Sequence, residues 1–432
     1  MSFAGVRTLC ARAAVLALSA PLLMAGPIPA SAATIGDAMT PAVESESQVD
    51  FLPDSDADAK APTPCTDLIP LGCFGPDTIR AAYGLQAVLD QGITGKGQTI
   101  VIIDAFQDPT LETDVAKFDG FWGLPPLKLT KYDRGIPPFD PTSKAQVSFS
   151  LEIAIDVEWA HATAPDAAIV LVQAKSENDT DLVAATEFAV DNNLGDVITQ
   201  SFGEAEMCAS PDVLAQQHAV FQQAAERGMT VFASSGDKGA ARQSCDGKSL
   251  VFSVSTPASD PQVTGVGGTH LVAGAGGAYI SEFAWNTPRG ASGGGFSTLY
   301  RRPGYQAPFQ ENNKARGVPD VAYNADGASG FIIVWRGMRG VAGGTSAGTP
   351  QWASIVALAD QAGGRRLGAI NKTLYHIAKS DAYSSAFHDI TSGNNTFMGI
   401  TGYDAKPGWD PVTGLGAPIV NNLIPLLIDG QG

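Results

Sequence analysis

Hydrophobic and amphipathic stretches alternate along the middle of the chain. Short apolar runs rich in β-branched residues predict buried strands at 99–105, 167–174, 197–202 and 229–234. Amphipathic stretches between and after them predict helices at 109–122, 147–162, 181–192, 213–227 and 346–362. Strands that alternate with helices form parallel βαβ units, with helices packed on each face of the sheet. We therefore expect an α/β fold with a mostly parallel central sheet and helices on both faces.

The first 32 residues have the pattern of a secretory signal peptide. Arg7 and Arg12 precede an apolar run at 13–25, and small residues at 30–32 form a cleavage site. The apolar run is too short to span a bilayer. We expect the mature protein to be secreted and extracellular, with no membrane association after the signal peptide is cleaved.

Residues 33–64 differ in composition from the rest of the chain. They are rich in Ser, Asp, Glu, Ala and Pro, a composition that does not form a packed core. We expect an acidic, flexible leader here, too short to be a folded prosegment. Ordered structure is expected to begin near Cys65 and to form one domain over 65–432.

Composition and charge narrow the classes of protein. The chain has 432 residues, of which 44% are hydrophobic and 16% are charged, with 48 glycines and 28 prolines. This composition indicates a loop-rich globule rather than disorder or a coiled coil. The formal net charge of −17 disfavours binding to nucleic acid or to anionic membrane surfaces. We expect a monomer.

Four cysteines follow the predicted signal peptide: Cys65, Cys73, Cys208 and Cys245. In a secreted chain an even number of cysteines indicates disulfides, although four cysteines allow three pairings. Proximity favours Cys65–Cys73. Cys208 and Cys245 come after different predicted strands, so a disulfide between them would join two loops at one edge of the sheet. The absence of a C-x-x-C spacing argues against zinc.

Ser346 lies within 343–350 (GGTSAGTP), at the start of the last predicted helix. A serine among small residues at a helix N-terminus has an accessible hydroxyl, and the backbone N–H groups there stabilise an anion formed beside it. A helix-capping serine is the simpler interpretation, but capping does not require the surrounding glycines. The G-T-S-x-x-x-P pattern is similar to the nucleophile segment of the subtilisin-like clan.

A subtilisin-like protease uses a histidine base, and this sequence lacks one in the expected context. Asp104 ends the first strand, at the position of the triad aspartate, but no His-Gly-Thr segment opens the following helix. In its place Glu152 and Asp156 stand four residues apart, on one face of a predicted helix. A solvated acidic face is the commoner fate of such a pair, but the surrounding residues are largely apolar. Two carboxyl groups beside a serine can take the part of histidine at lower pH.

With these features the chain resembles the sedolisin family, the serine-carboxyl peptidases. The motifs stand in family order: Glu152 with Asp156, 201–203 (SFG), 234–237 (SSGD), 292–297 (SGGGFS) and 344–346 (GTS). The resemblance implies a subtilisin-like fold and an acid-active endopeptidase that acts on peptides or proteins. It makes Ser346 the nucleophile, Glu152 its general base and Asp156 the residue that orients Glu152. Asp237 then donates a hydrogen bond to the oxyanion, for which it must be protonated.

The resemblance also implies a substrate-binding strand and a calcium site. The backbone of Ser201 and Gly203 is expected to pair with an extended peptide. One structural Ca²⁺ ion is expected in a C-terminal loop region, bound by Asp389, Ile390, Gly408 and Asp410. Lys406 replaces a glycine of the family pattern, and plain turns are the alternative interpretation of these loops.

Two other functions are alternatives. A neutral subtilisin-type protease is disfavoured by the missing histidine. A catalytically silent, calcium-stabilised secreted protein that only binds peptides is disfavoured because all four catalytic positions carry the required chemistry. Asp104 is a candidate for the network behind Glu152.

Overall fold

The computed structural model of the protein describes residues 43–45, 47–51, 73–310 and 312–430. The predicted signal peptide, most of the predicted leader and Cys65 lie outside the described residues. No helix within the described ranges is long and apolar enough to cross a membrane.

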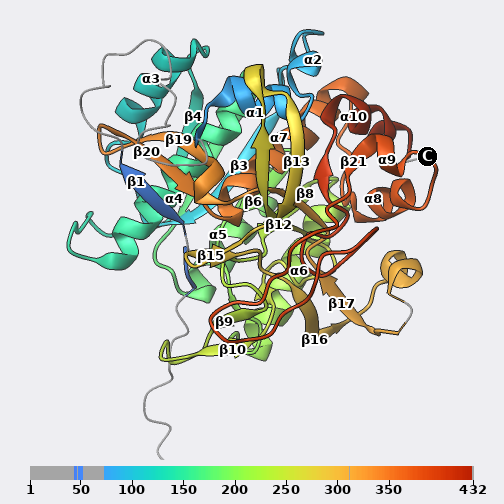
Figure 1. The fold of residues 1–432 in the computed structure, drawn as a ribbon. Helices are drawn as coiled ribbons and strands as arrows, with labels where there is room; N and C mark the ends of the chain where they lie inside the picture. Colours follow the sequence, from blue (N-terminus) through green and yellow to red (C-terminus); the bar gives the residue numbers. More distant parts are fainter. Residues whose placement is uncertain (1–42, 46, 52–72, 311, 431–432) are drawn as a thin grey trace, which may run out of the picture. The chain divides into compact units, whose positions relative to one another are not determined.

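A mostly parallel sheet forms the centre of the fold (Figure 1). Among the described residues it has eight strands, which are β3 (Thr99–Ala105), β4 (Lys128–Asp133), β5 (Ala168–Ala174), β6 (Val197–Gln200), β8 (Thr230–Ser234), β12 (Thr264–Ala273), β13 (Tyr279–Ala284) and β18 (Val321–Asn324). Their order is β13-β12-β8-β6-β3-β5-β4, with β18 also paired to β12. Only the pairing of β12 with β13 is antiparallel in this described sheet. The predicted parallel sheet is confirmed.

Helices cover both faces of this sheet. The long ones are α3 (Leu111–Trp122), α4 (Lys144–Thr163), α5 (Asp179–Asp191), α6 (Pro211–Glu226) and α7 (Thr345–Gly363). Ile100 and Ile102 of β3 pack in one hydrophobic core with α4 and α7, whereas Val101 and Ile103 pack in a second core with α5 and α6. Alternate side chains of a strand point to opposite faces, so a continuously apolar strand needs cover on both sides. The predicted helices are all present, with ends that differ by at most three residues.

A second sheet contains part of the predicted leader. Its strands are β1 (Gln48–Phe51), β20 (Met338–Gly343), β19 (Gly330–Trp335) and β2 (Cys73–Phe74), in that order. Figure 1 labels the first three of them. β1 runs antiparallel to β20, with Gln48 opposite Gly343. The expectation that ordered structure begins only near Cys65 is therefore wrong for β1. A segment whose own composition is polar can become ordered when its backbone forms hydrogen bonds with a strand that is distant in the sequence.

Shorter elements complete the described chain. The short helices are α1 (Pro76–Ala82), α2 (Gln86–Leu89), α8 (Asn371–Ala378), α9 (Tyr383–Ala386) and α10 (Val420–Asp429). The short strand pairs are β7 (Glu204–Ala205) with β11 (Ser255–Thr256), β9 (Ala241–Gln243) with β10 (Leu250–Phe252), β14 (Asn286–Thr287) with β15 (Gly290–Ala291), β16 (Gly295–Arg301) with β17 (Ala315–Val318), and β21 (Phe387–His388) with β22 (Ala417–Pro418).

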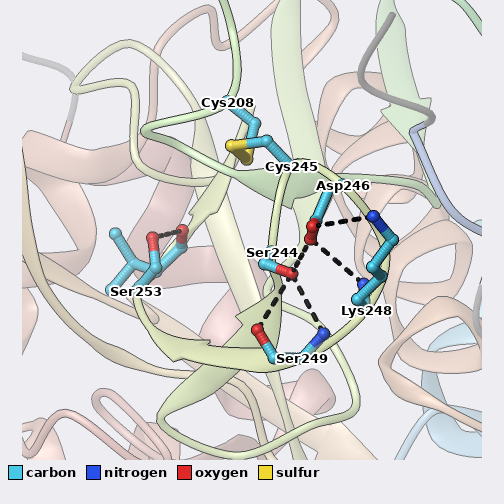
Figure 2. The surroundings of a disulfide bond; sticks show 8 residues. Cys208, Ser244, Cys245, Asp246, Lys248, Ser249 and Ser253 are labelled. Carbon is cyan, nitrogen blue, oxygen red and sulfur yellow. Dashed lines mark hydrogen bonds and ion pairs between the residues drawn. A yellow bond between two sulfur atoms is a disulfide. The ribbon is translucent and has the colours of Figure 1, made fainter. Parts of the chain in front are cut away.

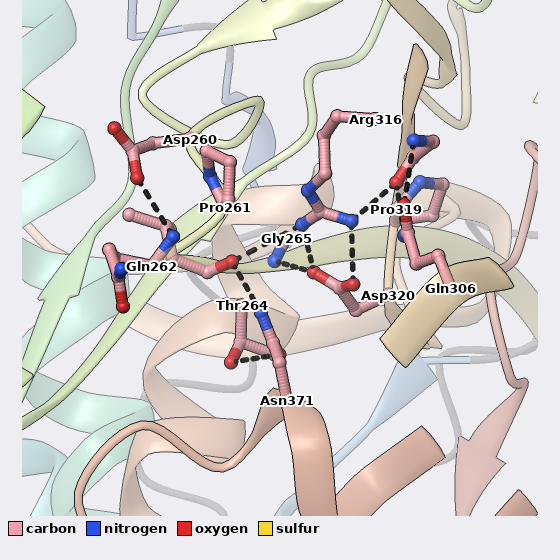
Figure 3. A network of polar contacts seen from close by, with 12 residues as sticks. Asp260, Pro261, Gln262, Thr264, Gly265, Gln306, Arg316, Pro319, Asp320 and Asn371 are labelled. Carbon is pink, nitrogen blue, oxygen red and sulfur yellow. Dashed lines mark hydrogen bonds and ion pairs between the residues drawn. The ribbon is translucent and has the colours of Figure 1, made fainter. Parts of the chain in front are cut away.

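A buried ion pair fixes the connection between β17 and β18 to the central sheet (Figure 3). Arg316 Nη1 donates to Asp320 Oδ1 at 2.7 Å, and both side chains are fully buried. Asp320 also accepts from the backbone N–H of Gly265 in β12 at 2.8 Å and from the hydroxyl of Tyr375 in α8 at 2.9 Å. A buried charge requires such partners. The network thus joins the loop, the sheet and a C-terminal helix.

Candidate active site

The two carboxyl groups of α4 lie inside the protein. Ser143 caps the helix by accepting a hydrogen bond from the N–H of Gln146 at 3.4 Å. From Phe149 to the end of the helix every residue is buried. Glu152 and Asp156 are one turn apart and both have 0% exposure. The alternative of a solvated acidic face is therefore excluded.

Asp104, at the end of β3, joins Glu152 and Asp156 in a buried carboxyl cluster. Burial raises the pKa of Glu152 to about 7, an effect that the Ser45 hydroxyl opposes and the charge of Asp237 increases. Burial, and then the charge of Glu152, raises the pKa of Asp156 well above its usual value. The pKa of Asp104 rises through burial and through the charges of the other two. In such a cluster each ionised carboxyl makes the next ionisation harder.

Ser346 lies in the first turn of α7. The N-cap residue Gly344 has a φ of +129°, and a Cβ at this position would lie 2.6 Å from Oδ2 of Asp237, so the turn requires glycine. The Ser346 hydroxyl donates to the carbonyl oxygen of Ser201 at 3.3 Å. It lies close enough to Glu152 to lower the pKa of that carboxyl. Oε1 of Glu152 has no hydrogen-bond partner among the described residues.

Asp237 follows β8 and is held against the start of α7. Its Oδ1 accepts hydrogen bonds from the backbone N–H and from the hydroxyl of Thr345, each at 2.8 Å. The same hydroxyl accepts from the N–H of Gly236 at 3.1 Å. Oδ2 is the atom nearest to the Cβ position of Gly344 and faces the turn that carries Ser346. The structure therefore brings Asp237 and Ser346 together, as the sequence predicts.

Ser201 connects the serine to the carboxyl cluster. Its hydroxyl donates to Asp156 Oδ1 at 2.8 Å, and its carbonyl oxygen is the acceptor for Ser346. Two residues further on, the backbone of Gly203 exchanges two hydrogen bonds with Glu44, at 3.1 and 3.3 Å. The backbone at Gly203 thus pairs with an extended chain, which in this structure is the protein's own.

Residues 43–45 and 47–51, hereafter the cleft segment, lie across this site. Ser45 Oγ donates to Oε2 of Glu152 at 2.6 Å, and the carbonyl oxygen of Ser45 accepts from the hydroxyl of Ser148 in α4 at 3.1 Å. At its other end the segment forms β1, which pairs with β20 directly before Gly344. The cleft segment covers Glu152 and contributes to its burial.

The histidines of the described chain have their contacts elsewhere. Four of the five histidines show this, among other contacts: His161 contacts the Pro125 carbonyl at 2.8 Å, His218 contacts Asp260 at 2.7 Å, His270 contacts Asp326 at 2.8 Å, and His388 stacks on Tyr279. None of these contacts involves Ser346. The Ser346 hydroxyl has the Ser201 carbonyl oxygen as its acceptor and lies beside the Glu152 carboxyl.

Cys208 and Cys245 form a disulfide, with Cα atoms 5.2 Å apart (Figure 2). Cys208 follows β7, and Cys245 lies between β9 and β10, where side-chain hydrogen bonds close the adjoining turn. The predicted bridge between two loops is confirmed. Cys73 at the start of β2 is also disulfide-bonded, and its expected partner Cys65 lies outside the described residues.

The residues expected to bind calcium lie in two loops that touch. The N–H of Gly408 donates to Asp389 Oδ2 at 2.9 Å. Asp410 is fully buried, burial raises its pKa to about 6, and it accepts from three backbone N–H groups, those of Lys406, Val412 and Thr413. No three His, Cys, Asp or Glu side chains of the described ranges form a metal site, so a cation here would also need carbonyl oxygens. Two carboxylates and the carbonyls of Ile390 and Gly408 are a donor set that fits Ca²⁺.

A mostly parallel sheet between two helical layers, with a serine in the first turn of a buried helix, is the subtilisin-like α/β fold. The chain is similar to a solved structure of Pseudomonas sedolisin in complex with pseudo-iodotyrostatin, with a TM-score of 0.73 and 29% identity, covering 81% of this chain and 96% of that one. It is 36% identical over 349 residues to kumamolisin from Bacillus sp. (strain MN-32) and 34% identical over 253 residues to sedolisin from Pseudomonas sp. (strain 101). The chain belongs to the sedolisin family of serine-carboxyl peptidases.

These alignments cover parts of the proteins compared. They include 78% of this chain and 61% of kumamolisin, and 56% of this chain and 42% of the strain 101 sedolisin. No protein-family model matches the chain.

The site contains residues that sequence reasoning missed. Lys238 Nζ lies 2.6 Å from Oε2 of Glu44, and Arg289 forms an ion pair with Asp50, so two cations hold the cleft segment. The position of Lys238, directly after Asp237, is the one sequence signal that points to it. Arg289 follows no motif and is found only through its contact.

Proposed function

We propose that the protein is a secreted, acid-active serine-carboxyl endopeptidase that hydrolyses peptide bonds through an acyl-enzyme on Ser346. One observation carries this proposal: Ser201 links the Ser346 hydroxyl to the buried carboxyl cluster, through a carbonyl acceptor on one side and a 2.8 Å hydrogen bond to Asp156 on the other. Membership of a family of serine-type peptidases supports the reaction class. The disulfide between Cys208 and Cys245 is typical of secreted proteins.

Glu152 is the general base of the proposed reaction. As Ser346 Oγ attacks the carbonyl carbon of the substrate, Oε1 of Glu152 accepts its proton and a C–O bond forms. Protonated Glu152 then gives this proton to the leaving amine as the C–N bond breaks. Water hydrolyses the acyl-enzyme by the same two proton transfers. Asp156 stays protonated because its pKa is raised, which keeps a second negative charge away from Glu152.

Asp237 stabilises the tetrahedral intermediate in this proposal. Its Oδ1 is held by Thr345, which leaves Oδ2 toward the turn of Ser346. A proton on Oδ2 would donate to the oxyanion, whereas an ionised carboxylate would repel it. The role therefore requires the neutral acid.

The charge states of these groups set the expected pH dependence. Glu152 must be ionised, so activity falls as the pH decreases through its pKa; Asp237 must be protonated, so activity falls again as the pH rises and removes its proton. The pKa of about 7 for Glu152 belongs to the covered site. When the cleft segment is displaced, water reaches Glu152 and lowers its pKa. Protonation of Asp237 lowers the pKa of Glu152 further, because it removes a neighbouring negative charge. Activity is then expected to be highest in an acidic pH range, between the ionisation of Glu152 and that of Asp237.

We also propose that Asp389, Asp410 and the carbonyls of Ile390 and Gly408 hold one structural Ca²⁺ ion. Two observations support this proposal: the hydrogen bond between the loops of Gly408 and Asp389, and the burial of the Asp410 carboxyl. An ion that binds only the native state would stabilise the fold by mass action.

The test of the reaction is hydrolysis of a quenched peptide at acid and neutral pH by the parent, Ser346→Ala and Glu152→Gln. We expect Ser346→Ala to lose roughly 10⁴-fold or more in kcat and Glu152→Gln about 10²–10⁴-fold, each with an unchanged circular-dichroism spectrum. Glu158→Gln is the matched control, because Glu158 is buried in the same helix and bonds the N–H of Val334 instead of facing Ser346.

Normal turnover by folded Ser346→Ala would refute the nucleophile. A folded parent that binds peptides but cleaves none between acid and neutral pH would identify the silent peptide-binding alternative. An optimum at neutral pH would refute acid activity while leaving the serine-carboxyl mechanism in place. Secretion is tested separately, by N-terminal sequencing of protein recovered from the culture medium.

A further inference from the structure

The cleft segment binds in the manner of an extended peptide. On one side of Ser346 its Glu44 pairs with Gly203 through two backbone hydrogen bonds, and on the other side β1 pairs with β20. Backbone pairing of this kind holds an extended peptide without regard to its side chains, and contacts to individual side chains then decide which sequence binds. The side-chain contacts of the cleft segment therefore indicate what the cleft selects.

Lys238 makes the strongest of these contacts. Its Nζ lies 2.6 Å from Oε2 of Glu44, and the two side chains keep only 25% and 29% of their surface exposed. A short, partly buried contact between charged groups discriminates between a carboxylate and an amide better than a solvated one. The second contact, between Arg289 and Asp50, joins side chains that are 56% and 50% exposed, and it contributes less.

The contact is placed close to the reacting groups. Lys238 directly follows Asp237, whose carboxyl is fixed to the first turn of α7. The backbone of Lys238 is therefore held beside the site, and its side chain reaches the residue that pairs with Gly203. Lys238 and Glu44 line a pocket whose wall also contains Lys144 and Glu177, two residues of opposite charge.

We propose that Lys238 is a specificity-determining residue that selects peptides with a carboxylate side chain at the residue paired with Gly203. This inference rests on the proposed function and names its substrate class, which is acidic peptides. Ser45 contacts Glu152, and β1 begins after Ser47, so the bond presented to Ser346 lies between the positions of Ser45 and Ser47. The selected acidic residue is then the second or third before the cleaved bond.

The experiment compares two quenched peptides that differ only in Glu or Gln at this position, with mass spectrometry to identify the cleaved bond. It is run at about pH 5.5, where a free Glu side chain is ionised. We expect the parent to prefer the Glu peptide by roughly three- to tenfold in kcat/KM. Lys238→Met, which keeps the length of the side chain, should bring this ratio close to one.

Lys144→Met is the matched control, since Lys144 is an exposed lysine of the same pocket and should leave the ratio unchanged. Each ratio is taken within one enzyme, so a general change in activity cancels. Equal rates on the two peptides by the parent, or an unchanged preference in Lys238→Met, would overturn the inference. The second result would mean that Lys238 only anchors the cleft segment.

A binding experiment separates this inference from the proposed reaction. Dissociation constants of the same two peptides are measured with Ser346→Ala by fluorescence anisotropy, and the cleft segment competes equally with both. We expect Ser346→Ala to bind the Glu peptide more tightly than the Gln peptide, and the double variant Ser346→Ala with Lys238→Met to lose this difference. That result supports the inference even if the parent cleaves neither peptide. Equal dissociation constants would overturn it, whatever the parent cleaves.

Discussion

Replacing Asp237 by asparagine and by alanine tests the proposed oxyanion site. Asparagine keeps an oxygen that can accept from the N–H and hydroxyl of Thr345, both 2.8 Å from Oδ1 in the parent. Its amide nitrogen then takes the place of Oδ2, toward the turn of Ser346, and donates at any pH. Alanine removes the acceptor and the donor together.

The two substitutions should differ in their effects on turnover and on stability. Loss of one oxyanion donor costs about 10²–10³-fold in kcat, or about 2.7–4 kcal/mol of transition-state stabilisation. Asp237→Ala also leaves the buried N–H of Thr345 without its partner, which lowers the free energy of unfolding by about 1–3 kcal/mol. Asp237→Asn should retain most of the turnover and the stability. Its alkaline limb should move upward or disappear, because an amide has no proton to lose in this range.

The assay is kcat/KM from about pH 3 to about pH 9 for the parent and both variants, with urea unfolding to measure stability. Asp246→Asn serves as a control, because it removes an exposed carboxyl from the loop beside the disulfide, where Asp246 bonds only its own turn. Its profile should match that of the parent. An alkaline limb at the same pH in an active Asp237→Asn enzyme would show that Asp237 does not supply the donor.

Two further predictions concern stability. Chelation of calcium should lower the melting temperature, and Asp410→Ala should lower it equally and make it insensitive to the chelator; an unchanged melt in both would leave only the interpretation of plain turns. Arg316→Met should lower the free energy of unfolding in urea by about 3–5 kcal/mol, because it leaves the buried Asp320 unpaired. A loss below about 1 kcal/mol, the value typical of a surface pair, would show that this network does not hold the loop.

The central sheet and its helices could be predicted because their signals are local. The strand at 99–105 is apolar at the successive positions 100–103, and such a strand is stable only between two covered faces, as β3 is. The spacing of Glu152 and Asp156 places them on one helix face, and the apolar residues around them indicate the burial that the structure shows. The proximity of Ser346 and Asp237 could be predicted because the two residues lie in loops at the same end of neighbouring elements.

The features that sequence reasoning missed depend on distant partners. β1 contains the polar residues Gln48 and Asp50 and forms a strand only through β20, almost three hundred residues later in the chain. Arg316 and Asp320 have a spacing that suggests an exposed helical pair, yet they lie in and after a strand and are fully buried. Neither contact leaves a periodic pattern, so hydrophobicity alone could not reveal it.

The cleft segment has a consequence for the affinity of any competing peptide. Because it is part of the same chain, it competes intramolecularly, at an effective concentration that does not depend on the concentration of the protein. Dilution and dialysis cannot remove such a competitor. A substrate would therefore show an apparent KM raised by a constant factor over that of a chain lacking residues 43–51. The value of kcat at saturation would be the same in both, since the segment is then displaced.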